Sequence, residues 1–455
     1  MAYATQDHWA EDFITASTSG QTAPSPAAFP ESPHASRSYW IREFPIPFED
    51  QWIKAPIQSE VDVAIIGSGI SGASVAYALS ESRPGLKIAM FEARGICTGA
   101  TGRNGGHIGR PEAYNMIEMS KIFGVEDAVR QRQLTRINRE MMIDTVKKLD
   151  AVEEVDLSIK GTLVVFKDGN ERQKFVDDLA YAKEIGLKTE GHVVDAEWVS
   201  KHLAISPSKT QFGGAYLENS ALERMNDFSL HPYTPVSKVD FDCDASDHKF
   251  TLTTSKGQVK TKIVFHATNG YVSHVLPSMA GKNGVIGCRA HMIGISPNLP
   301  RTAVQLEGGF GYADFWHWIL QRPNNGPYLY GLATAEKMGD YNDTTTIPDN
   351  DPIRMEMLSF LEEVFPHSFK DLTVEKDIVY DWTGVQGFTA TGASIVGRPN
   401  PERRGEFVSV GHNGEGMGRC FACSVVIHEA ILAELDGITT WTPPAWFPMS
   451  YRRNI

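Results

Sequence analysis

The stretch Val61-Asp62-Val63-Ala64-Ile65-Ile66-Gly67-Ser68-Gly69-Ile70-Ser71-Gly72 decides the fold class. Its first six residues form a short, mostly apolar run that predicts a buried strand, and a Gly-x-Gly-x-x-Gly turn follows it directly and leads into a predicted helix over 73–82. In this context Gly67 permits a tight turn, Gly69 lets a pyrophosphate approach the backbone, and Gly72 lets the helix pack against the strand. The N-terminus of that helix supplies N–H donors and a positive dipole end for phosphate groups.

A second strand, predicted over 86–91, completes a βαβ unit within about 30 residues. Glu92 ends this strand 20 residues after Gly72, where a carboxylate can accept both hydroxyl groups of a ribose and disfavours a ribose 2′-phosphate. The sequence therefore predicts an α/β dinucleotide-binding unit that does not use NADP. The alternative is a purely structural glycine turn followed by a surface glutamate.

A second glycine cluster follows at once: Gly99-Ala100-Thr101-Gly102-Arg103-Asn104-Gly105-Gly106-His107-Ile108. Four glycines in these ten residues indicate a backbone that wraps closely around a flat or anionic group. Arg103 can offer positive charge to such a group, and Asn104 can offer amide hydrogen bonds. The alternative is a mobile glycine loop without a ligand.

At this cluster the chain resembles the D-amino-acid oxidase (DAO) superfamily of FAD-dependent oxidoreductases. The Ala-Thr-Gly-Arg-Asn-Gly-Gly core looks most like the γ-glutamylputrescine oxidase type and its fungal relatives. The resemblance covers roughly residues 38–450. Four later segments carry it: Thr234-Pro235-Val236, His266-Ala267-Thr268-Asn269-Gly270-Tyr271, Asp381-Trp382-Thr383-Gly384 through Gly397, and Gly411-His412-Asn413-Gly414-Glu415-Gly416-Met417.

The resemblance implies FAD as the cofactor, with adenine at the backbone of Val236 and the flavin N1–C2 carbonyl at the helix start that follows the last motif. Reduced flavin carries negative charge at N1–C2, which a helix N-terminus stabilises. Because no cysteine lies near Gly384, where some members attach the flavin, we expect non-covalent FAD. The residues expected to contact the cofactor are Gly67, Gly69, Ile70, Ser71, Gly72, Glu92, Ala93, Arg94, Thr101, Arg103, Asn104, Gly105, Gly106, Val236, Ala267, Thr268, Asn269, Gly411, Asn413, Gly414, Gly416 and Met417.

The implied fold is α/β, with an FAD-binding Rossmann-type (glutathione-reductase-like) half and a mainly antiparallel α+β substrate half. The expected organisation is an N-terminal arm (1–54), a discontinuous FAD-binding domain (55–115, 213–283 and 384–445), a substrate domain (116–212 and 284–383) and a C-terminal tail (446–455).

The chemistry implied by the resemblance is oxidation of a C–N bond in an amine or modified amino acid to an imine, by hydride transfer to flavin N5. The partners would be a small amine-type substrate and an electron acceptor, which could be O2. Because the flavin carries the difficult step, the protein needs only to position a deprotonated amine and exclude water. We expect Glu415 to pair with a substrate ammonium, and the alternative is a solvated loop acid or a charge partner of a helix N-terminus. Among His107, His291, His317 and His412, we select His107 to assist proton transfer.

Two features leave the substrate open. Amino-acid-specific members clamp the substrate carboxylate with a basic pair, and the corresponding positions fall close to Gly109 and Gly418. Arg110 and Arg419 each lie one residue away, so a one-residue shift would restore the clamp. Trp316, Trp318 and Trp382 could wall a substrate pocket, although aromatic residues on strands usually belong to a core.

The chain departs from the family where Ser229-Leu230-His231-Pro232-Tyr233 runs straight into Thr234-Pro235-Val236. The family places a multi-turn helix between these segments, and parallel strands need a crossover of about a dozen residues. Either the strand is reached by another route, or the chain has lost a helix and exposes one face of the FAD-binding sheet.

Composition limits the partners. A net charge of −13 argues against nucleic acid and anionic membranes, and no apolar run reaches the 18 or so residues of a membrane helix. No secretory signal is recognisable, and the five cysteines indicate free thiols in a reducing, cytoplasmic setting. Cys420 and Cys423 form a C-x-x-C, but no second ligand pair accompanies it, so we expect no metal.

Two other functions stay open on the sequence. The chain could keep FAD and oxidise a C–O or C–C bond in a tailoring reaction, or it could be a degenerate, non-catalytic relative. Flavin reduction by amines distinguishes the first of these from amine oxidation, and a colourless folded protein would indicate the second.

Overall fold

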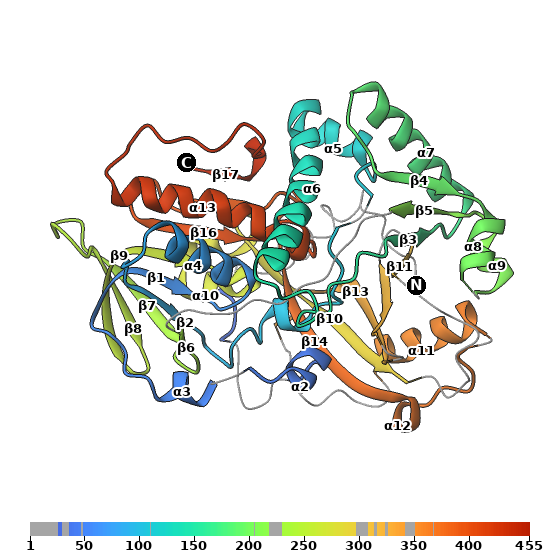
Figure 1. Ribbon diagram of the computed structural model, residues 1–455, viewed down its shortest axis with the longest axis horizontal. Helices are drawn as coiled ribbons and strands as arrows, with labels where there is room; N and C mark the ends of the chain where they lie inside the picture. The colour runs from blue at the N-terminus through green and yellow to red at the C-terminus, as the bar shows by residue number, and fades with distance from the viewer. Residues whose placement is uncertain are drawn as a thin grey trace.

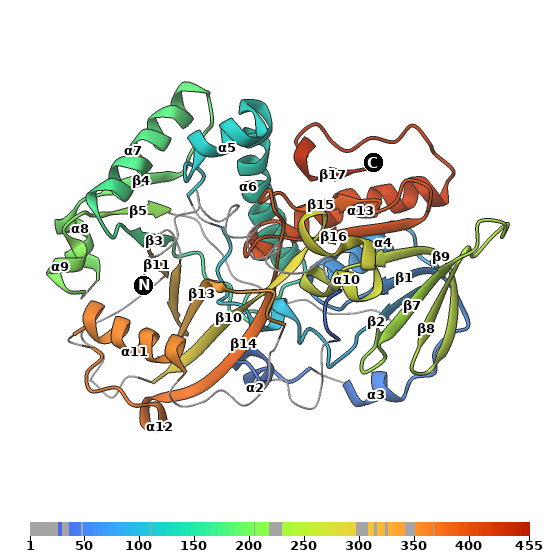
Figure 2. The ribbon, with the colours of Figure 1, turned by 180° about the vertical axis from the view of Figure 1, so that it is seen from behind.

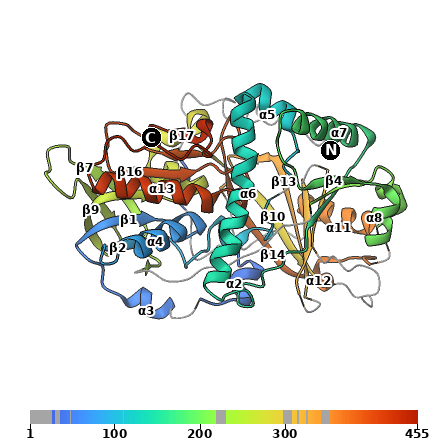
Figure 3. The ribbon, with the colours of Figure 1, turned by 45° about the horizontal axis from the view of Figure 1, so that its top comes forward.

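The computed structural model describes residues 26–29, 36–46, 49–109, 111–203, 205–217, 230–296, 308–313, 316–323, 326–341, 351–366 and 368–455. Two sheets lie side by side and form two halves, with the long helix α6 (Val125–Lys148) between them (Figure 1). The same arrangement is visible when the molecule is tilted forward (Figure 3). The fold is therefore the expected α/β type with two halves.

The first sheet has nine strands in the described part of the chain, and its central order is β17-β15-β16-β9-β1-β2-β6, with β8 pairing to β9 and β7 to β8. The pairs β9–β1, β1–β2 and β2–β6 are parallel. Its strands are β1 (Glu60–Ile66), β2 (Ile88–Phe91), β6 (Leu230–His231), β7 (Val236–Phe241), β8 (Phe250–Thr254), β9 (Gly257–His266), β15 (Ile395–Gly397), β16 (Glu406–Val410) and β17 (Arg452–Arg453).

Both faces of this sheet are covered. Helices α4 (Ile70–Ser82) and α13 (Cys420–Leu435) pack on one face, where Val63, Ile65 and Phe265 are buried against their apolar side chains. On the other face the antiparallel strands β7 and β8 fold back over the parallel core (Figure 2). Period-2 alternation explains this division, since Ala64 and Ile66, which alternate with Val63 and Ile65 along β1, belong to the second cluster.

The structure explains how the chain reaches β7 without a crossover helix. Strand β7 pairs only with β8, and antiparallel, so the join before Thr234 needs no crossover. The parallel neighbour of β2 is instead β6, and the chain reaches it after passing through β3, β4 and β5 of the other sheet. Of the two alternatives that the sequence left open, the structure has the strand reached by another route, and in the described residues β7 and β8 cover the face that a lost helix would expose. Ser229 lies outside those residues.

The second sheet has eight strands in the described part of the chain, in the order β14-β10-β13-β12-β11-β3-β5-β4. All its pairs are antiparallel except β11–β3, as expected for a mainly antiparallel half. Its strands are β3 (Thr162–Val165), β4 (Gly191–Val194), β5 (Gly214–Leu217), β10 (Ile286–Ile295), β11 (Gly309–Tyr312), β12 (His317–Gln321), β13 (Tyr328–Met338) and β14 (Ile378–Phe388).

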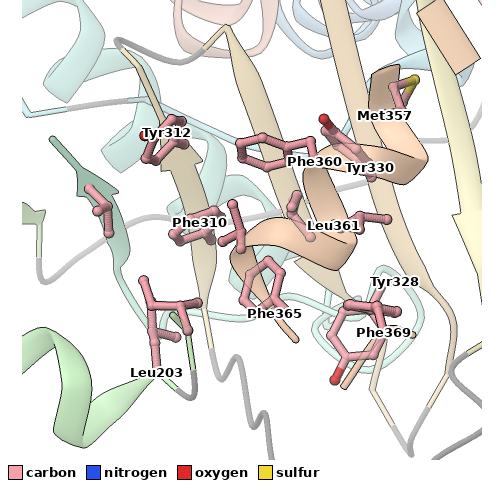
Figure 4. Close-up of a cluster of buried hydrophobic side chains, with 14 of the residues drawn as sticks. Leu203, Phe310, Tyr312, Tyr328, Tyr330, Met357, Phe360, Leu361, Phe365 and Phe369 are labelled. Atoms are coloured by element: carbon pink, nitrogen blue, oxygen red, sulfur yellow. The ribbon is translucent and has the colours of Figure 1, made fainter. Parts of the chain in front are cut away.

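One face of this sheet carries an aromatic core under α11 (Pro352–Val364). Phe310 and Tyr330 project from the strands toward Phe360 and Phe365, which belong to the helix and its end (Figure 4). Phe310 and Phe365 lie 5.6 Å apart between ring centroids in an edge-on arrangement. The opposite face of the sheet is thereby left to line the site between the halves.

Two helix ends follow from glycine. Gly124, whose φ is +79°, separates α5 (Met116–Phe123) from α6. Helix α13 ends where Gly437 adopts a φ of +69° and donates to the Glu434 carbonyl. The remaining α-helices are α2 (Tyr39–Glu43), α3 (Glu49–Lys54), α7 (Gly169–Glu184), α8 (Ala196–His202), α9 (Pro207–Thr210), α10 (Val272–Val275) and α12 (Val374–Asp377).

His317 belongs to the aromatic core rather than to a surface. Its Nδ1 lies 2.6 Å from the Tyr330 hydroxyl, and its ring stacks on Phe360 with 3.9 Å between centroids. Burial lowers the pKa of His317 to about 3. The folded protein therefore holds this ring neutral where an unfolded chain binds a proton.

We expect this burial to make folding sensitive to acid. Below about pH 6.5 the unfolded state binds a proton at His317 that the folded state does not bind. The free energy of unfolding therefore falls by about 1.4 kcal/mol for each pH unit down toward the folded pKa. Between pH 7 and pH 5, the free energy of unfolding measured in urea should therefore fall by about 2 kcal/mol less for His317→Phe than for the wild type. His192→Phe, at an exposed position on β4, is the matched control. Equal acid sensitivity of wild type and His317→Phe would contradict the assignment.

Candidate cofactor and substrate site

The turn between β1 and α4 is set by two close approaches of the backbone and by the glycine that begins the helix. Gly67 has a φ of +105°, and a Cβ there would lie 2.7 Å from the Ala267 carbonyl oxygen. A Cβ on Gly72 would lie 2.0 Å from the Gly67 oxygen, so only glycine lets the helix start against the strand end. Gly69 is the N-cap of α4 and leaves the helix N-terminus open toward a ligand.

Glu92 holds this turn from the neighbouring strand. Its Oε2 accepts from the N–H of Ser68 at 3.0 Å and from the Ser68 hydroxyl at 2.8 Å, and its Oε1 accepts from the N–H of Arg94 at 3.1 Å. These bonds orient the carboxylate at the carboxyl end of β2, where the sequence placed a ribose acceptor. Ser68, the variable residue of the motif, is thus part of the arrangement, although sequence reasoning gave it no role.

The second glycine cluster folds over the start of α4. Its first turn, η1 (Ala100–Arg103), brings the Thr101 hydroxyl 3.1 Å from the N–H of Ile70, which it caps. Asn104 is bound locally, because its Oδ1 accepts from Gly106 N–H at 2.6 Å and its Nδ2 donates to the Thr101 carbonyl. Two predicted phosphate contacts, Thr101 and Ile70, are therefore hydrogen-bonded to each other.

The guanidinium of Arg103 is directed into protein. It donates to the carbonyl oxygens of Thr98 at 2.6 Å and Thr383 at 2.8 Å, and to the Ser36 hydroxyl at 3.0 Å. The side chain is 3% exposed, so these oxygens surround its charge. The arrangement ties the glycine cluster to β14 rather than presenting a free cation to a phosphate.

The closing motif joins β16 to α13 through a left-handed turn. Asn413 has a φ of +54° and Gly414 a φ of +75°, and the Asn413 side chain accepts from Thr389 N–H at 2.8 Å. The Asn269 amide oxygen accepts from Gly411 N–H at 2.9 Å and so links the motif to the end of β9. Among the described residues, no protein group accepts from the N–H of Gly416 or Met417. These donors lie in η5 (Gly416–Gly418), directly before α13.

A cavity of about 490 Å³ joins these segments. All the predicted cofactor contacts line it except Gly72, Gly106 and Gly411, which shape the turns behind its wall. His107 and Glu415 line it as well. The structure thus brings together residues from five separate stretches of sequence.

The end of the cavity toward the second sheet is apolar and aromatic. Trp316 and Trp318 line it, together with Ala290 and Met292 of β10. Trp318 fits between two glycines, since a Cβ on Gly105 would lie 2.4 Å from its ring and one on Gly331 2.1 Å. Trp382 differs from these two tryptophans, because it is fully buried and its indole N–H donates to the Arg103 carbonyl at 2.9 Å.

Two charged groups of the cavity lining, Glu415 and Arg419, form an ion pair with each other. The Nη1 of Arg419 also donates to the Gly392 carbonyl at 3.2 Å. Arg419 is 7% exposed and lies over the ring of Tyr451. Gly109 and Gly418, the positions of the family's basic pair, both line the cavity. Arg110 lies outside the described residues.

The four histidines fall into different environments. His107 lines the cavity, and burial lowers its pKa to about 4. His412 also lines the cavity, with its Nδ1 3.1 Å from the Ser394 hydroxyl, and burial lowers its pKa to about 4. His291 faces away toward α11, and its Nε2 lies 2.8 Å from Asp381. At neutral pH, His107 and His412 are thus uncharged at the site.

The C-x-x-C pair is buried in α13. All five cysteines are free, and burial raises the pKa of the Cys420 thiol to about 12 and that of Cys423 well above its usual value. Cys420 lines the cavity beside Ser71, while Cys423 packs in the apolar core. In the described part of the chain, no group of three histidine, cysteine or acidic side chains is placed to hold a metal ion.

Sequence reasoning missed a polar stripe on α6. Gln131, Thr135 and Asn138 are buried on one face of the helix, and the first two line the cavity. Asn138 donates to the Met417 carbonyl at 2.8 Å and accepts from Ala422 N–H at 3.1 Å, so it fixes the closing motif. The spacing i, i+4, i+7 of polar residues on a predicted long helix was the available signal.

The residues present fit FAD. The site combines a glycine turn at a helix N-terminus, an oriented acid after the second strand, and open N–H donors at Gly416 and Met417. At Gly67 and Gly105 a Cβ would collide with the Ala267 carbonyl and with the Trp318 ring, so only glycine fits at these two positions of the cavity lining. Such a site accommodates an elongated, anionic dinucleotide along one sheet edge.

No helix in the described parts of the chain is long and apolar enough to cross a membrane. The structure is similar to glycine oxidase from Geobacillus kaustophilus, with a TM-score of 0.66 at 18% identity, over 86% of this chain and 99% of that one. It is also similar to L-proline dehydrogenase from P. horikoshii, with a TM-score of 0.61 at 17% identity, over 86% and 98% of the two chains. These similarities concern the fold.

In sequence, the chain is 24% identical to γ-glutamylputrescine oxidoreductase of Escherichia coli (strain K12) over 240 residues, 49% of this chain. That match spans about half of the relative, 52% of its length. The profile of the FAD dependent oxidoreductase family DAO matches residues 62–429, most of the chain. The chain therefore belongs to the DAO family of FAD-dependent oxidoreductases.

Proposed function

We propose that this chain oxidises the C–N bond of an amine or modified amino acid to an imine. The observation that supports this most is the continuity of one cavity, from the dinucleotide turn past Gly416 and Met417 to a wall formed by Trp316 and Trp318. When bound, FAD supplies the two-electron acceptor for hydride from the carbon beside the amine. O2 or another acceptor would then reoxidise it.

The protein's own contribution is to place a neutral amine in a dry, apolar pocket. Trp318 and Met292 exclude water, which strengthens the electrostatic interactions of the few polar groups present. The Gly416 and Met417 N–H donors in η5 would stabilise negative charge on the bound cofactor. No side chain is required to form a covalent bond to the substrate.

His107 would serve as a neutral orienting group in this scheme. A histidine whose pKa is about 4 holds a proton poorly at pH 7, so it does not act as a strong base for an ammonium group. We propose that the amine loses its proton to solvent on entry and that His107 then contacts the neutral amine. Glu415, held by Arg419, would attract and align the amine-bearing end.

We favour an amine or a larger modified amino acid over a glycine-like substrate. The cavity arginine nearest to the family's clamp position, Arg419, already pairs with Glu415 and is therefore poorly placed to bind a substrate carboxylate. The sequence relation to a γ-glutamylputrescine oxidoreductase supports the same substrate class.

We also propose the domain division given above: an FAD-binding half formed by 55–115, 213–283 and 384–445, and a substrate half formed by 116–212 and 284–383. The two sheets support most of it, but β5 and the end of β14 belong to the second sheet although the division assigns them to the FAD-binding half. We also propose a cytoplasmic location, because the five cysteines are free thiols and free thiols are typical of a reducing compartment. Fluorescence microscopy of the tagged chain would test the location, and limited proteolysis would test the division.

The reaction is tested by anaerobic reduction of the flavin. The purified yellow protein should lose its flavin colour when mixed without oxygen with a reactive member of a panel of amines, N-methylated amines and modified amino acids. Reduction by alcohols but by no amine would overturn the C–N assignment, and a protein that folds without binding FAD would overturn catalysis altogether. The control is the same protein mixed with the corresponding trimethylammonium compounds, which have no lone pair.

The role of Glu415 is tested by removing its negative charge. Glu415→Gln should raise KM for the amine about tenfold and change kcat little, because uniform binding of the amine end is lost. The matched control is Glu118→Gln, which alters another carboxylate of the cavity lining that pairs instead with Lys121 on α5. If the variant loses FAD but its residual holoenzyme keeps an unchanged KM, Glu415 only stabilises the closing motif and does not bind the amine.

We propose that FAD is held without a covalent bond. The cysteine of the cavity wall, Cys420, lies beside Ser71 rather than on β14, and its buried thiol is protonated because its pKa is about 12. Acid precipitation should therefore leave all the flavin in the supernatant. Flavin colour that stays with the precipitated chain would contradict the proposal.

A further inference from the structure

The N-terminal arm over residues 36–44 lies outside the part of the chain matched by the family profile, which begins at residue 62. It is nevertheless built into the interior, since Ser36 and Ser38 are 3% and 0% exposed. Tyr39 packs with Met292, Leu329 and Trp382 behind the cavity wall. An arm buried this deeply stabilises the segments that it contacts.

What it covers is the second glycine cluster. The Ser38 hydroxyl donates to the Gly102 carbonyl at 2.5 Å, and the Trp40 indole N–H donates to the Asn104 carbonyl at 2.7 Å. The carbonyl between them, that of Arg103, accepts from Trp382. Side chains thus hold three successive carbonyl groups of the loop, and two of these side chains belong to the arm.

Ser36 joins the same loop to the second sheet. Its hydroxyl oxygen accepts from the Arg103 guanidinium at 3.0 Å and from the N–H of Thr383 at 3.1 Å. Thr383 precedes Gly384 on β14, and Gly384 lines the cavity. The arm therefore connects the cofactor loop of one half to the cavity strand of the other.

Peptide geometry gives these bonds a consequence. In a trans peptide the N–H points opposite to the carbonyl of the preceding residue. Because Trp40 of the arm holds the Asn104 carbonyl, the N–H of Gly105 points away from the arm. Gly105 lines the cavity, so the arm orients this donor toward the bound ligand.

The arm also reaches the adenine end. Ala27 N–H donates to the Ser273 hydroxyl at 2.8 Å, and His274 Nδ1 lies 3.1 Å from the Ala27 carbonyl. Phe29 packs on His274 with 5.3 Å between ring centroids, and both rings line the cavity beside Val236. Residues 26–29 and 36–44 thus contact the two ends of one cavity.

We propose that the N-terminal arm is part of the FAD site: Ser38 and Trp40 are positioning residues that fix the glycine loop in its FAD-binding conformation, and Phe29 closes the adenine end. Release of FAD then requires these contacts to open. The proposal concerns binding of the cofactor and is independent of which substrate the enzyme oxidises.

The experiment measures FAD affinity in the full chain. Apoprotein of each variant is titrated with FAD, and the quenching of flavin fluorescence gives Kd. Ser38→Ala and Trp40→Phe each leave a buried carbonyl without its donor, which should raise Kd about tenfold. Phe29→Ala should raise the rate of FAD release on dilution.

Matched controls separate this role from general stability. Ser237→Ala and Trp441→Phe remove the same kinds of donor from bonds outside the cavity lining, to Thr253 and to Glu429. Ser38→Thr keeps the hydroxyl and should restore the wild-type Kd. Urea unfolding of each apoprotein reports stability, and circular dichroism of the bound flavin reports its surroundings.

Each outcome of the titrations either supports or overturns the proposal. A higher Kd and altered flavin dichroism in Ser38→Ala and Trp40→Phe, with both controls unchanged and Ser38→Thr restored, support the proposal. Unchanged Kd in the arm variants overturns it. A rise in Kd that only follows the loss of apoprotein stability, equally in arm and control variants, also overturns it and leaves the arm a structural element.

Discussion

The close contact between the first strand and the helix that follows it is the constraint on which the rest of the molecule depends. A Cβ on Gly72 would lie 2.0 Å from the Gly67 oxygen, and one on Gly67 2.7 Å from the Ala267 oxygen, so three backbone segments meet without side chains between them. This contact fixes where α4 begins, and the Thr101 hydroxyl then caps Ile70 and sets the second glycine loop above it. The cavity exists because these backbones pack so closely.

Much of the first sheet could be predicted from sequence because its determinants are local. The apolar run before Gly67, the glycine spacing and the acid at Glu92 each act within a few residues. The start of α13 and its end at Gly437 followed from the same kind of signal. The antiparallel pairing of β10 with β14, by contrast, joins segments about 90 residues apart, and no local pattern specifies such a partner.

Side-chain partners were the part that sequence could not supply. Arg103 lies in the loop that the motif indicated, but its guanidinium is bound by Ser36, Thr98 and Thr383, which come from three separate regions. Glu415 and Arg419 are four residues apart, a spacing compatible with a pair, yet the glycines between them allow many backbone paths. No crossover is needed after Tyr233, because β7 pairs antiparallel with β8, and the parallel neighbour of β2 is β6, a strand of two residues that the sequence did not indicate.

Trp318 lies between Gly105 of the cofactor loop and Gly331 of the second sheet, at distances that admit no other side chain at either glycine. One indole therefore forms both the back of the glycine loop and part of the apolar wall of the cavity. Shortening this residue would remove the support of the loop, and adding bulk at either glycine would push the indole into the cavity. Met292 also packs against Gly331, so Trp316 is the residue of this wall whose size can change without disturbing the contact between Trp318 and its two glycines.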